Sequence, residues 1–195
     1  MKILIDNGHG VDTAGKCSPD KTLYEYKWAR EIANRLVAAL KAKGYDAERI
    51  VTEETDVPLR TRCQRVNAIC QKVGAKNCLL ISVHINAAGK GTWNTATGWS
   101  GWVAPNASAN SKKLAQCLYA EAEARNLKGN RSVPSCKYWV GNFAVVRDTN
   151  CPAVLTENLF QDNQQEVKYL LSETGKHTIV DLHVNGIINY IKTIK

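Results

Sequence analysis

Two histidines and a glutamate, widely separated in the chain, carry the side chains best suited to hold a metal ion. His9 lies between two glycines in ILIDNGHGV (3–11), Glu25 comes one short loop later, and His84 follows the apolar stretch NCLLISV (77–83). Imidazole and carboxylate groups are the ligands of catalytic zinc sites that keep one position open for water. The chain has no HExxH sequence, so the pattern predicts a site for one zinc ion, assembled from separate segments.

The neighbours of His9 indicate how its side chain is presented. Gly8 and Gly10 permit backbone angles and close approaches that larger residues resist, so the imidazole can point out of a strand end. Asp6 or Asn7 could orient the ring, because metal-bound histidines usually donate their second N–H to a nearby oxygen. In the alternative interpretation, Asp6 simply ends a strand in solvent.

Taken singly, each candidate also has a structural explanation. A histidine at a strand end often packs and forms hydrogen bonds, and Glu25 in the first turn of a helix would be favoured by the helix dipole. Only the combination favours metal binding. His177 and His183 lie six residues apart near the carboxyl terminus and share no helical face, so we assign them no chemistry.

The apolar pattern predicts alternating strands and helices that would position these residues. Apolar runs without alternation indicate strands buried on both faces, and apolar residues every three to four positions indicate amphipathic helices. Strands are expected at 2–6, 46–51, 77–84, 98–104, 143–147 and 153–157. Helices are expected from about residue 22 to Gly44, at 59–73 and 109–126, and as one or two closing helices over 164–194.

This alternation is typical of an α/β fold with a single, largely parallel but mixed, twisted sheet of about six strands and helices on both faces. The sequence shows no internal repeat or linker, so residues 1–195 are expected to form one catalytic domain. In such sheets ligands gather at the carboxyl ends of the strands. His9, His84 and Glu157 follow the first, third and last long apolar strands at that edge.

The composition argues against several classes of protein. Apolar residues make up 44% of the chain and charged residues 23%, as in soluble globular proteins. The amino terminus lacks the apolar core of a signal peptide, and no apolar run reaches the ~18 residues of a bilayer span, so no membrane insertion is expected. Seven cysteines without a CxxC pair indicate reduced thiols, with Cys63 and Cys70 in a helix core.

The net charge of +8 favours an anionic partner. The basic clusters LRTRCQR (59–65) and NSKKL (110–114) fall on helical patterns and are interpreted as solvated outer faces. No zinc-finger, helix-turn-helix or RNP-like motif is present, so nucleic acid is not the expected partner.

Four blocks of the sequence, in their order, resemble the zinc-dependent N-acetylmuramoyl-L-alanine amidases of the type 3 cell-wall hydrolase family. The blocks are ILIDNGHG (3–10), LYEYKWAREIANRL (23–36), ISVHINA (81–87) and NFAVVRDTNCPAVLTENLFQDN (142–163). The resemblance covers nearly the whole chain. Val11, Asn158 and Leu159 depart from the family pattern, in which glycine or another small residue is usual; these departures affect the expected shape of the groove but not the ligand set.

The resemblance implies that His9, Glu25 and His84 hold one Zn²⁺ and that Glu157 is the catalytic acid/base. It implies that zinc-activated water attacks the lactyl carbonyl joining muramic acid to L-alanine, while Glu157 accepts the water's proton and passes it to the leaving amine. The expected partner is peptidoglycan, an anionic polymer that would attract a basic monomer. Like endolysins and autolysins, the protein would be made in the cytoplasm and act on the cell wall after release or export.

Two other functions remain open at this point. A non-catalytic peptidoglycan-binding module would need no general base. A phosphate- or nucleotide-binding α/β domain could use the glycine-containing loop after the first strand, although the chain has neither GxxxxGK[ST] nor GxGxxG.

Aromatic residues near the predicted site suit either sugar rings or core packing, with no preference between the two. They are Trp93, Trp99, Trp102, Tyr138 and Trp139. Asn86 and Arg147 are also close to the predicted site in sequence, where they could contact substrate or cap local structure.

Overall fold

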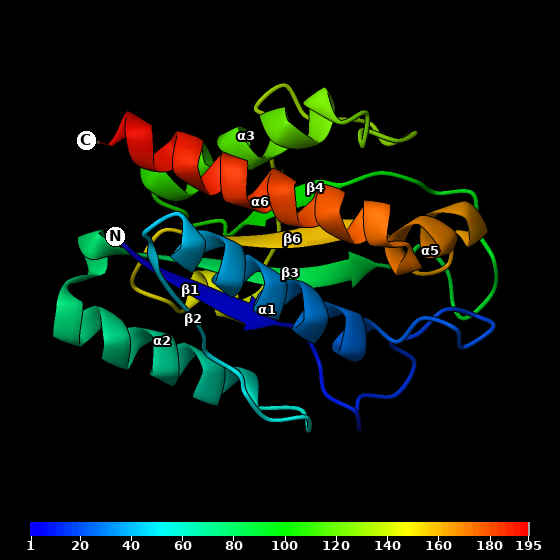
Figure 1. The fold of residues 1–195 in the computed structure, drawn as a ribbon, viewed down its shortest axis with the longest axis horizontal. Coiled ribbons are helices and arrows are strands. Elements are labelled where there is room, and N and C mark those ends of the chain that lie inside the picture. The colour runs from blue at the N-terminus through cyan, green and yellow to red at the C-terminus, as the bar shows by residue number, and fades with distance from the viewer. Residues whose placement is uncertain (195) are drawn as a thin grey trace.

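A six-stranded mixed sheet runs through the molecule, with helices on both of its faces (Figure 1). The structure, a computed structural model, describes residues 1–194. The strands are β1 (Lys2–Asn7), β2 (Asp46–Arg49), β3 (Cys78–Asn86), β4 (Ser100–Val103), β5 (Trp139–Val140) and β6 (Ala153–Phe160). The helices are α1 (Glu25–Ala42), α2 (Leu59–Val73), α3 (Ala109–Ala124), α4 (Ala144–Arg147), α5 (Gln164–Leu171) and α6 (Glu173–Thr193), with a 3₁₀ turn, η1, at Ala75–Asn77.

The strand order is β2-β1-β3-β6-β4-β5, and the pairing is parallel except between β4 and β6. The predicted fold class is therefore confirmed. The central strands β1, β3 and β6 point the same way, so their carboxyl ends share one edge of the sheet, where the loops that follow them converge (Figure 1).

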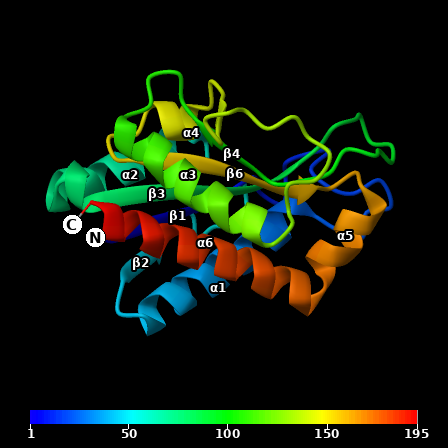
Figure 2. The same ribbon diagram turned by 90° about the horizontal axis from the view of Figure 1, so that it is seen from above.

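Two apolar layers hold the helices to the sheet. Helices α1, α3, α5 and α6 lie over one face and α2 and α4 over the other (Figure 2). Successive side chains of a strand point to opposite faces, so Ile3 and Ile5 join the first layer while Leu4 joins the second. This explains why β1 and β3 are apolar without alternation, as expected of strands covered on both sides.

The prediction of a strand at 143–147 is wrong, because this stretch contains the short helix α4. Short apolar runs do not reveal their conformation by periodicity alone. Local hydrogen bonds decide it here, because the Asp148 N–H donates to the Ala144 carbonyl and the Thr149 hydroxyl to the Val145 carbonyl. The remaining strand of the sheet is β5, a two-residue strand paired with β4 that the apolar pattern did not indicate.

The expectation for the cysteines agrees with the structure. All seven cysteines are free thiols, and Cys63 and Cys70 are buried on α2. Ser108 caps α3 by accepting a hydrogen bond from the Ser111 N–H. None of the helices in residues 1–194 combines the length and apolar character needed to cross a bilayer.

Candidate metal centre and active site

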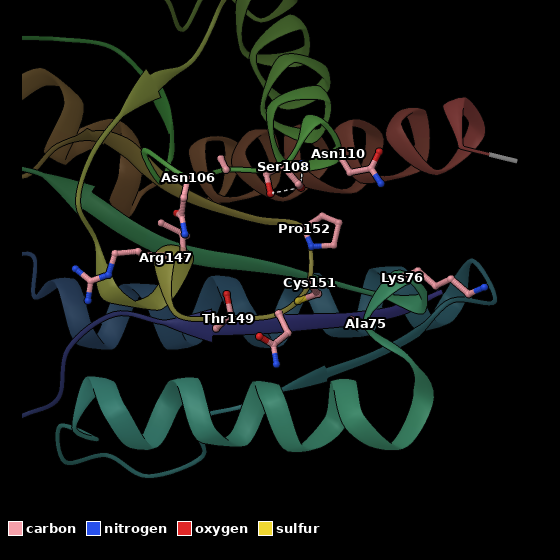
Figure 3. Close-up of a pocket in the computed structure, with 13 residues that line it drawn as sticks. Ala75, Lys76, Asn106, Ser108, Asn110, Arg147, Thr149, Cys151 and Pro152 are labelled. Carbon is pink, nitrogen blue, oxygen red and sulfur yellow. Dashed lines mark hydrogen bonds between the residues drawn. The ribbon is translucent and has the colours of Figure 1, made fainter.

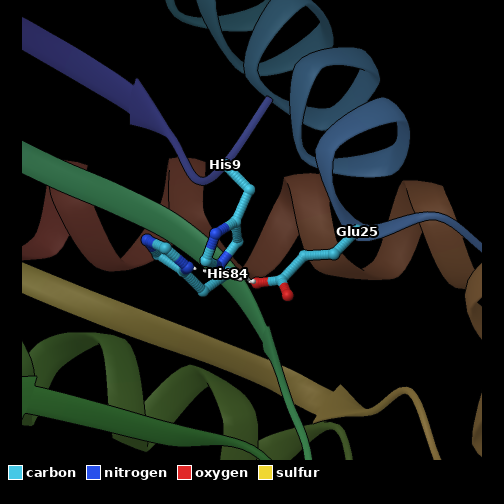
Figure 4. A group of neighbouring side chains, drawn as sticks. All are labelled: His9, Glu25 and His84. Atoms are coloured by element: carbon cyan, nitrogen blue, oxygen red, sulfur yellow. Dashed lines mark hydrogen bonds and ion pairs between the residues drawn. The ribbon is translucent and has the colours of Figure 1, made fainter. Parts of the chain in front are cut away.

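The three predicted metal ligands converge at the carboxyl edge of the sheet (Figure 4). His9 follows β1, His84 lies near the end of β3, and Glu25 is the first residue of α1. Oε1 of Glu25 lies 3.1 Å from Nδ1 of His84 and 3.4 Å from Nε2 of His9. One candidate ligand atom of each residue lies within 4.8 Å of the other two. Three segments distant in sequence thus meet at one point.

Close packing of the loop after β1, against β3 and against the loop before α2, accounts for both glycines of GHG. A β-carbon at Gly8 would overlap the His84 ring, and one at Gly10 would overlap the backbone of residues 55–56. Neither glycine has a positive φ, whereas His9 itself has φ 59°. The expectation that the glycines supply unusual backbone angles is therefore wrong. They supply room, and the histidine takes the left-handed conformation, which is uncommon for a residue with a side chain.

Two arginines hold the loop in this conformation. The His9 carbonyl accepts hydrogen bonds from Nη1 of Arg30 at 2.9 Å and from Nη2 of Arg62 at 3.5 Å. Arg62 also forms ion pairs with Asp6 at 2.7 Å and Asp56 at 2.8 Å. Side chains from α1 and α2 therefore fix the backbone that presents the imidazole.

The burial of Arg62 contradicts the sequence interpretation of the LRTRCQR cluster as a solvated face. Only 2% of Arg62 is exposed, and it lines the cleft described below. Its position beside Cys63 and Val66, on the apolar stripe of α2, was the signal that could have revealed it. A buried arginine in such a stripe requires acidic partners, and the partners here come from the β1 strand and the α2 entry loop.

Neither Asp6 nor Asn7 orients the imidazole of the loop, contrary to expectation. The Asp6 carboxylate accepts hydrogen bonds from Arg62 and from the Ser82 hydroxyl, at 2.7 and 2.6 Å. Asn7 Oδ1 accepts a hydrogen bond from Nε of Arg49 at 3.1 Å. Both side chains are thus used to tie β1 to its neighbours.

Glu25 is a buried carboxylate whose surroundings favour its charged form. Burial raises its pKa, but hydrogen bonds from His84 and His9 outweigh burial and hold the pKa well below its usual range. Burial conversely lowers the pKa of His84, and the Glu25 carboxylate raises it above its ordinary value. The Ile85 N–H donates a further bond to Oε1 at 2.9 Å. The other carboxylate oxygen of Glu25, Oε2, is buried and has no hydrogen-bond partner within residues 1–194.

This donor set fits a zinc ion. Two neutral imidazoles and one carboxylate are a known ligand combination for catalytic zinc. The unpartnered Oε2 of Glu25 is a buried acceptor that a cation would satisfy. The ionised carboxylate between two imidazole rings provides the negative charge that a divalent cation needs.

Glu157 lies beside this group on β6. It is the register partner of His84 on β3 and of Ser100 on β4. Burial raises its pKa to about 7, helped by the nearby Glu25 and opposed by His84, Lys16 and Arg131. Its Oε2 atom is buried and accepts no hydrogen bond from the described residues.

A cleft of about 440 Å³ joins these groups. Its walls include His9, His84 and Glu157, and Lys16 and Phe143 also line it. Glu25 does not line the cleft and lies behind the histidines, with 1% of its surface exposed. The carboxyl of Glu157 and the imidazoles thus share one space that a ligand can enter.

The aromatic residues divide between core and surface. Trp99 is fully buried and donates its indole N–H to Oδ1 of Asn158, whereas Trp93 is 39% exposed. Trp102 and Trp139 are half-buried on β4 and β5, and Tyr138 packs against the core beside them. The sequence did not distinguish these environments.

Asn86 and Arg147 satisfy local partners. Asn86 accepts a hydrogen bond from the adjacent Ala87 N–H, and Arg147 pairs with Asp148 and donates to Asn142. Arg147 lines a separate cavity of about 330 Å³ near the start of β6, beside Pro152 (Figure 3). None of the three candidate metal ligands lines that cavity.

Comparison with known proteins identifies the family to which this fold and site correspond. The family model described as N-acetylmuramoyl-L-alanine amidase matches residues 3–189. The chain belongs to this amidase family. The endolysin of Bacillus phage SPP1 is 27% identical over 197 residues, covering 99% of this chain and 67% of the endolysin. The amidase CwlM of Bacillus licheniformis is 27% identical over 191 residues, covering 96% of this chain and 67% of CwlM.

Solved amidase structures share the fold. An N-acetylmuramoyl-L-alanine amidase from Clostridium difficile 630 superposes with a TM-score of 0.82 at 27% identity, covering 100% of this chain and 98% of that one. The catalytic domain of CwlV from Bacillus (Paenibacillus) polymyxa gives a TM-score of 0.80 at 23% identity, with 98% of each chain covered. The family match supports peptidoglycan amidase activity and leaves the phosphate-binding alternative without support.

Two departures of this amidase from the family pattern lie outside the cleft. The β3–β6 register shifts between His84 and Asn86, which makes a bulge at Asn158 and Leu159. Leu159 is 2% exposed with φ 65°, in the region that favours glycine. Asn158 is buried and donates to the His84 carbonyl at 2.9 Å. These residues shape the strand behind the site, and neither is among the residues that line the cleft.

Proposed function

We propose that this amidase is a zinc-dependent hydrolase that cleaves the amide bond between N-acetylmuramic acid and L-alanine. In this proposal His9, Glu25 and His84 hold one Zn²⁺ and Glu157 is the general acid/base. The main support is the convergence of the three ligand atoms within 4.8 Å, beside a carboxyl that is in register with His84.

The two buried carboxyls divide the chemistry between them. A zinc ion, when bound, supplies Lewis acidity that acidifies water and stabilises negative charge on the substrate carbonyl. Glu25, ionised and enclosed, orients both imidazoles through its Oε1. Glu157, whose pKa is raised to about 7, can accept a proton from the attacking water and return it to the departing L-alanine nitrogen.

We further propose that the protein acts as a monomer on the cell wall after release or export from the cytoplasm, without binding nucleic acid or inserting into a membrane. Its matches include a phage endolysin and a sporulation-specific amidase of Bacillus subtilis. The net charge of +8 suits an anionic wall polymer.

Digestion of purified peptidoglycan, followed by mass spectrometry, tests the proposed activity. We expect new L-alanine amino termini and muramic acid with a free lactyl carboxylate. A chelator should abolish their release and added Zn²⁺ should restore it, because removal of the metal leaves no Lewis acid in the site. Wall binding without any such products would instead identify a non-catalytic module, and chelator-resistant cleavage would contradict the role of the metal.

A further inference from the structure

A positively charged side chain outside the ligand set lies next to Glu157. Arg131, in the loop between α3 and β5, donates from Nη1 to the Ser100 hydroxyl at 2.9 Å. Ser100 is the register partner of Glu157 in the antiparallel β4–β6 pair, so the side chains of the two residues are neighbours on the same face. The guanidinium is therefore one residue away from the proposed acid/base.

Aromatic rings surround this guanidinium. Its central carbon lies 5.1 Å from the ring centre of Trp139, 5.4 Å from that of Phe160 and 6.0 Å from that of Trp102. The rings attract the cation and restrict its movement. The attraction to the rings orients the guanidinium group. It does not use the in-plane N–H groups as hydrogen-bond donors, so these stay available.

The hydrogen-bonding capacity of Arg131 is largely unused. A guanidinium carries five N–H donors, and within residues 1–194 only Nη1 of Arg131 reaches a protein acceptor. No carboxylate of those residues lies within ion-pair distance. Burial lowers the pKa of Arg131, and Glu157 and Glu166 are near enough to oppose that shift. This differs from Arg62, which forms ion pairs with two carboxylates. A half-buried, preorganised guanidinium that has no carboxylate partner within residues 1–194 is suited to bidentate binding of a planar anion.

We propose that Arg131 binds a free carboxylate of the substrate's peptide stem and thereby determines specificity. The inference rests on the proposed function, since the scissile amide must lie between the metal ligands and Glu157. Peptidoglycan stems carry a γ-linked glutamyl residue directly after L-alanine, and its α-carboxyl is free in some walls and amidated in others. Lys16, which lines the cleft, adds a second positive charge near Glu157.

Two soluble muropeptides test this assignment. They differ only in whether the second stem residue carries a free α-carboxylate or an α-carboxamide. We expect the wild-type amidase to cleave the carboxylate form with a kcat/KM about 10- to 100-fold higher, as befits a charge-assisted hydrogen bond. Arg131→Gln should lose this preference mainly through kcat/KM for the carboxylate form, while cleavage of the carboxamide form changes little. Arg131→Lys should retain part of the preference, because it keeps the charge and loses the fork geometry.

Lys128→Gln provides the control, because it removes one charge from the exposed part of the same loop and should keep the full preference. If the wild-type enzyme cleaves both substrates equally, or Arg131→Gln slows both by the same factor, Arg131 has only a structural role. Inhibition of the wild-type enzyme provides a second test that does not depend on whether the Arg131 variants fold. L-alanyl-D-isoglutamate should inhibit at least 10-fold better than L-alanyl-D-isoglutamine. Equal inhibition would reject the inference, whereas failure of the wild type to cleave either substrate would reject the proposed function itself.

Discussion

At the scale of single residues, two buried glutamates acquire opposite properties from their surroundings. Glu25 accepts hydrogen bonds from two imidazoles, and its pKa is held below the ordinary range despite its burial. Among the residues that the structure describes, none donates such a bond to Glu157, and burial raises its pKa to about 7. A permanently ionised carboxylate suits a metal ligand, whereas a carboxyl that titrates near neutral pH suits proton transfer. The environments thus support the division of roles proposed for them.

Glu157→Gln should lower kcat by at least ~100-fold, because an amide cannot accept the proton of the attacking water. The zinc content measured by atomic emission should stay the same, since the ligands are untouched. Glu123→Gln, an exposed change on α3, provides the control and should leave both quantities unchanged. Near-normal turnover by Glu157→Gln would remove Glu157 from the role of acid/base.

At the scale of secondary-structure elements, buried polar side chains join α2 and α6 to the strands behind the site. Arg62 of α2 reaches Asp6 at the end of β1. On α6, Nδ1–H of His183 donates to the Ile179 carbonyl at 2.7 Å, and Nε2 lies 3.0 Å from the Thr156 hydroxyl, from which it accepts. The Arg62–Asp6 and His183–Thr156 contacts each cross from a helix to a strand, so each fixes a distance that local sequence does not set.

Arg62→Met should destabilise the protein by about 3–5 kcal/mol, because it leaves the Asp6 carboxylate buried without its cation. Urea unfolding followed by circular dichroism measures this loss. Arg60→Met, on the exposed side of the same turn, should change the free energy of unfolding by no more than about 0.5 kcal/mol. Equal effects of the two variants would show that the Arg62–Asp6 pair contributes little to stability.

His183 should make the fold sensitive to acid. Burial lowers its pKa to about 4 from the ordinary value of 6.5. Between these two pH values the unfolded chain binds a proton at His183 that the folded chain does not. The contribution of neutral His183 to the free energy of unfolding is therefore complete above pH 6.5 and is lost as the pH falls towards 4. A shift of this size corresponds to about 3 kcal/mol.

Unfolding free energies measured at pH 4.5 and 7 should therefore differ less for His183→Gln than for the wild type. The exposed His177→Gln, on the same helix, should keep the pH dependence of the wild type. If His183→Gln retained the full difference, other groups would account for the sensitivity to acid.

At the scale of the whole molecule, net charge and the position of the cleft determine how the enzyme meets its substrate. The chain carries 26 basic and 18 acidic residues, giving a net charge of +8. Long-range attraction to an anionic wall concentrates a basic protein at the surface and weakens as salt screens it. The cleft opens at the carboxyl edge of the sheet, where Lys16 and Arg131 lie near Glu157.

Lysis of purified walls should slow as ionic strength rises from about 0.05 to 0.5 M, because the Debye length shortens to a few ångströms over this range. Turbidity assays report the rate. Cleavage of a small, uncharged muropeptide amide should change much less, and this comparison separates recruitment from chemistry. A salt-independent rate on whole walls would show that net charge does not recruit the enzyme.

The sequence alone determined which segments are strands and helices wherever the apolar pattern was long. It also carried the resemblance that indicated His9, Glu25, His84 and Glu157 before any distance was known. These features are local, since burial on one face or on both leaves a period in the order of residues. The short segment 143–147, with too few residues to show a period, was assigned incorrectly.

Only the tertiary structure decided how distant segments meet. It placed Oε1 of Glu25 between two imidazoles, buried Arg62 in a stretch expected to face solvent, and enclosed Arg131 in aromatic rings from β4, β5 and β6. It also showed that His9, and neither of the glycines beside it, takes the left-handed backbone conformation in the GHG loop. The physical reason is that these contacts, and the pKa shifts they cause, depend on strand order and helix packing, which bring together residues whose separation along the chain carries no record of their distance in space.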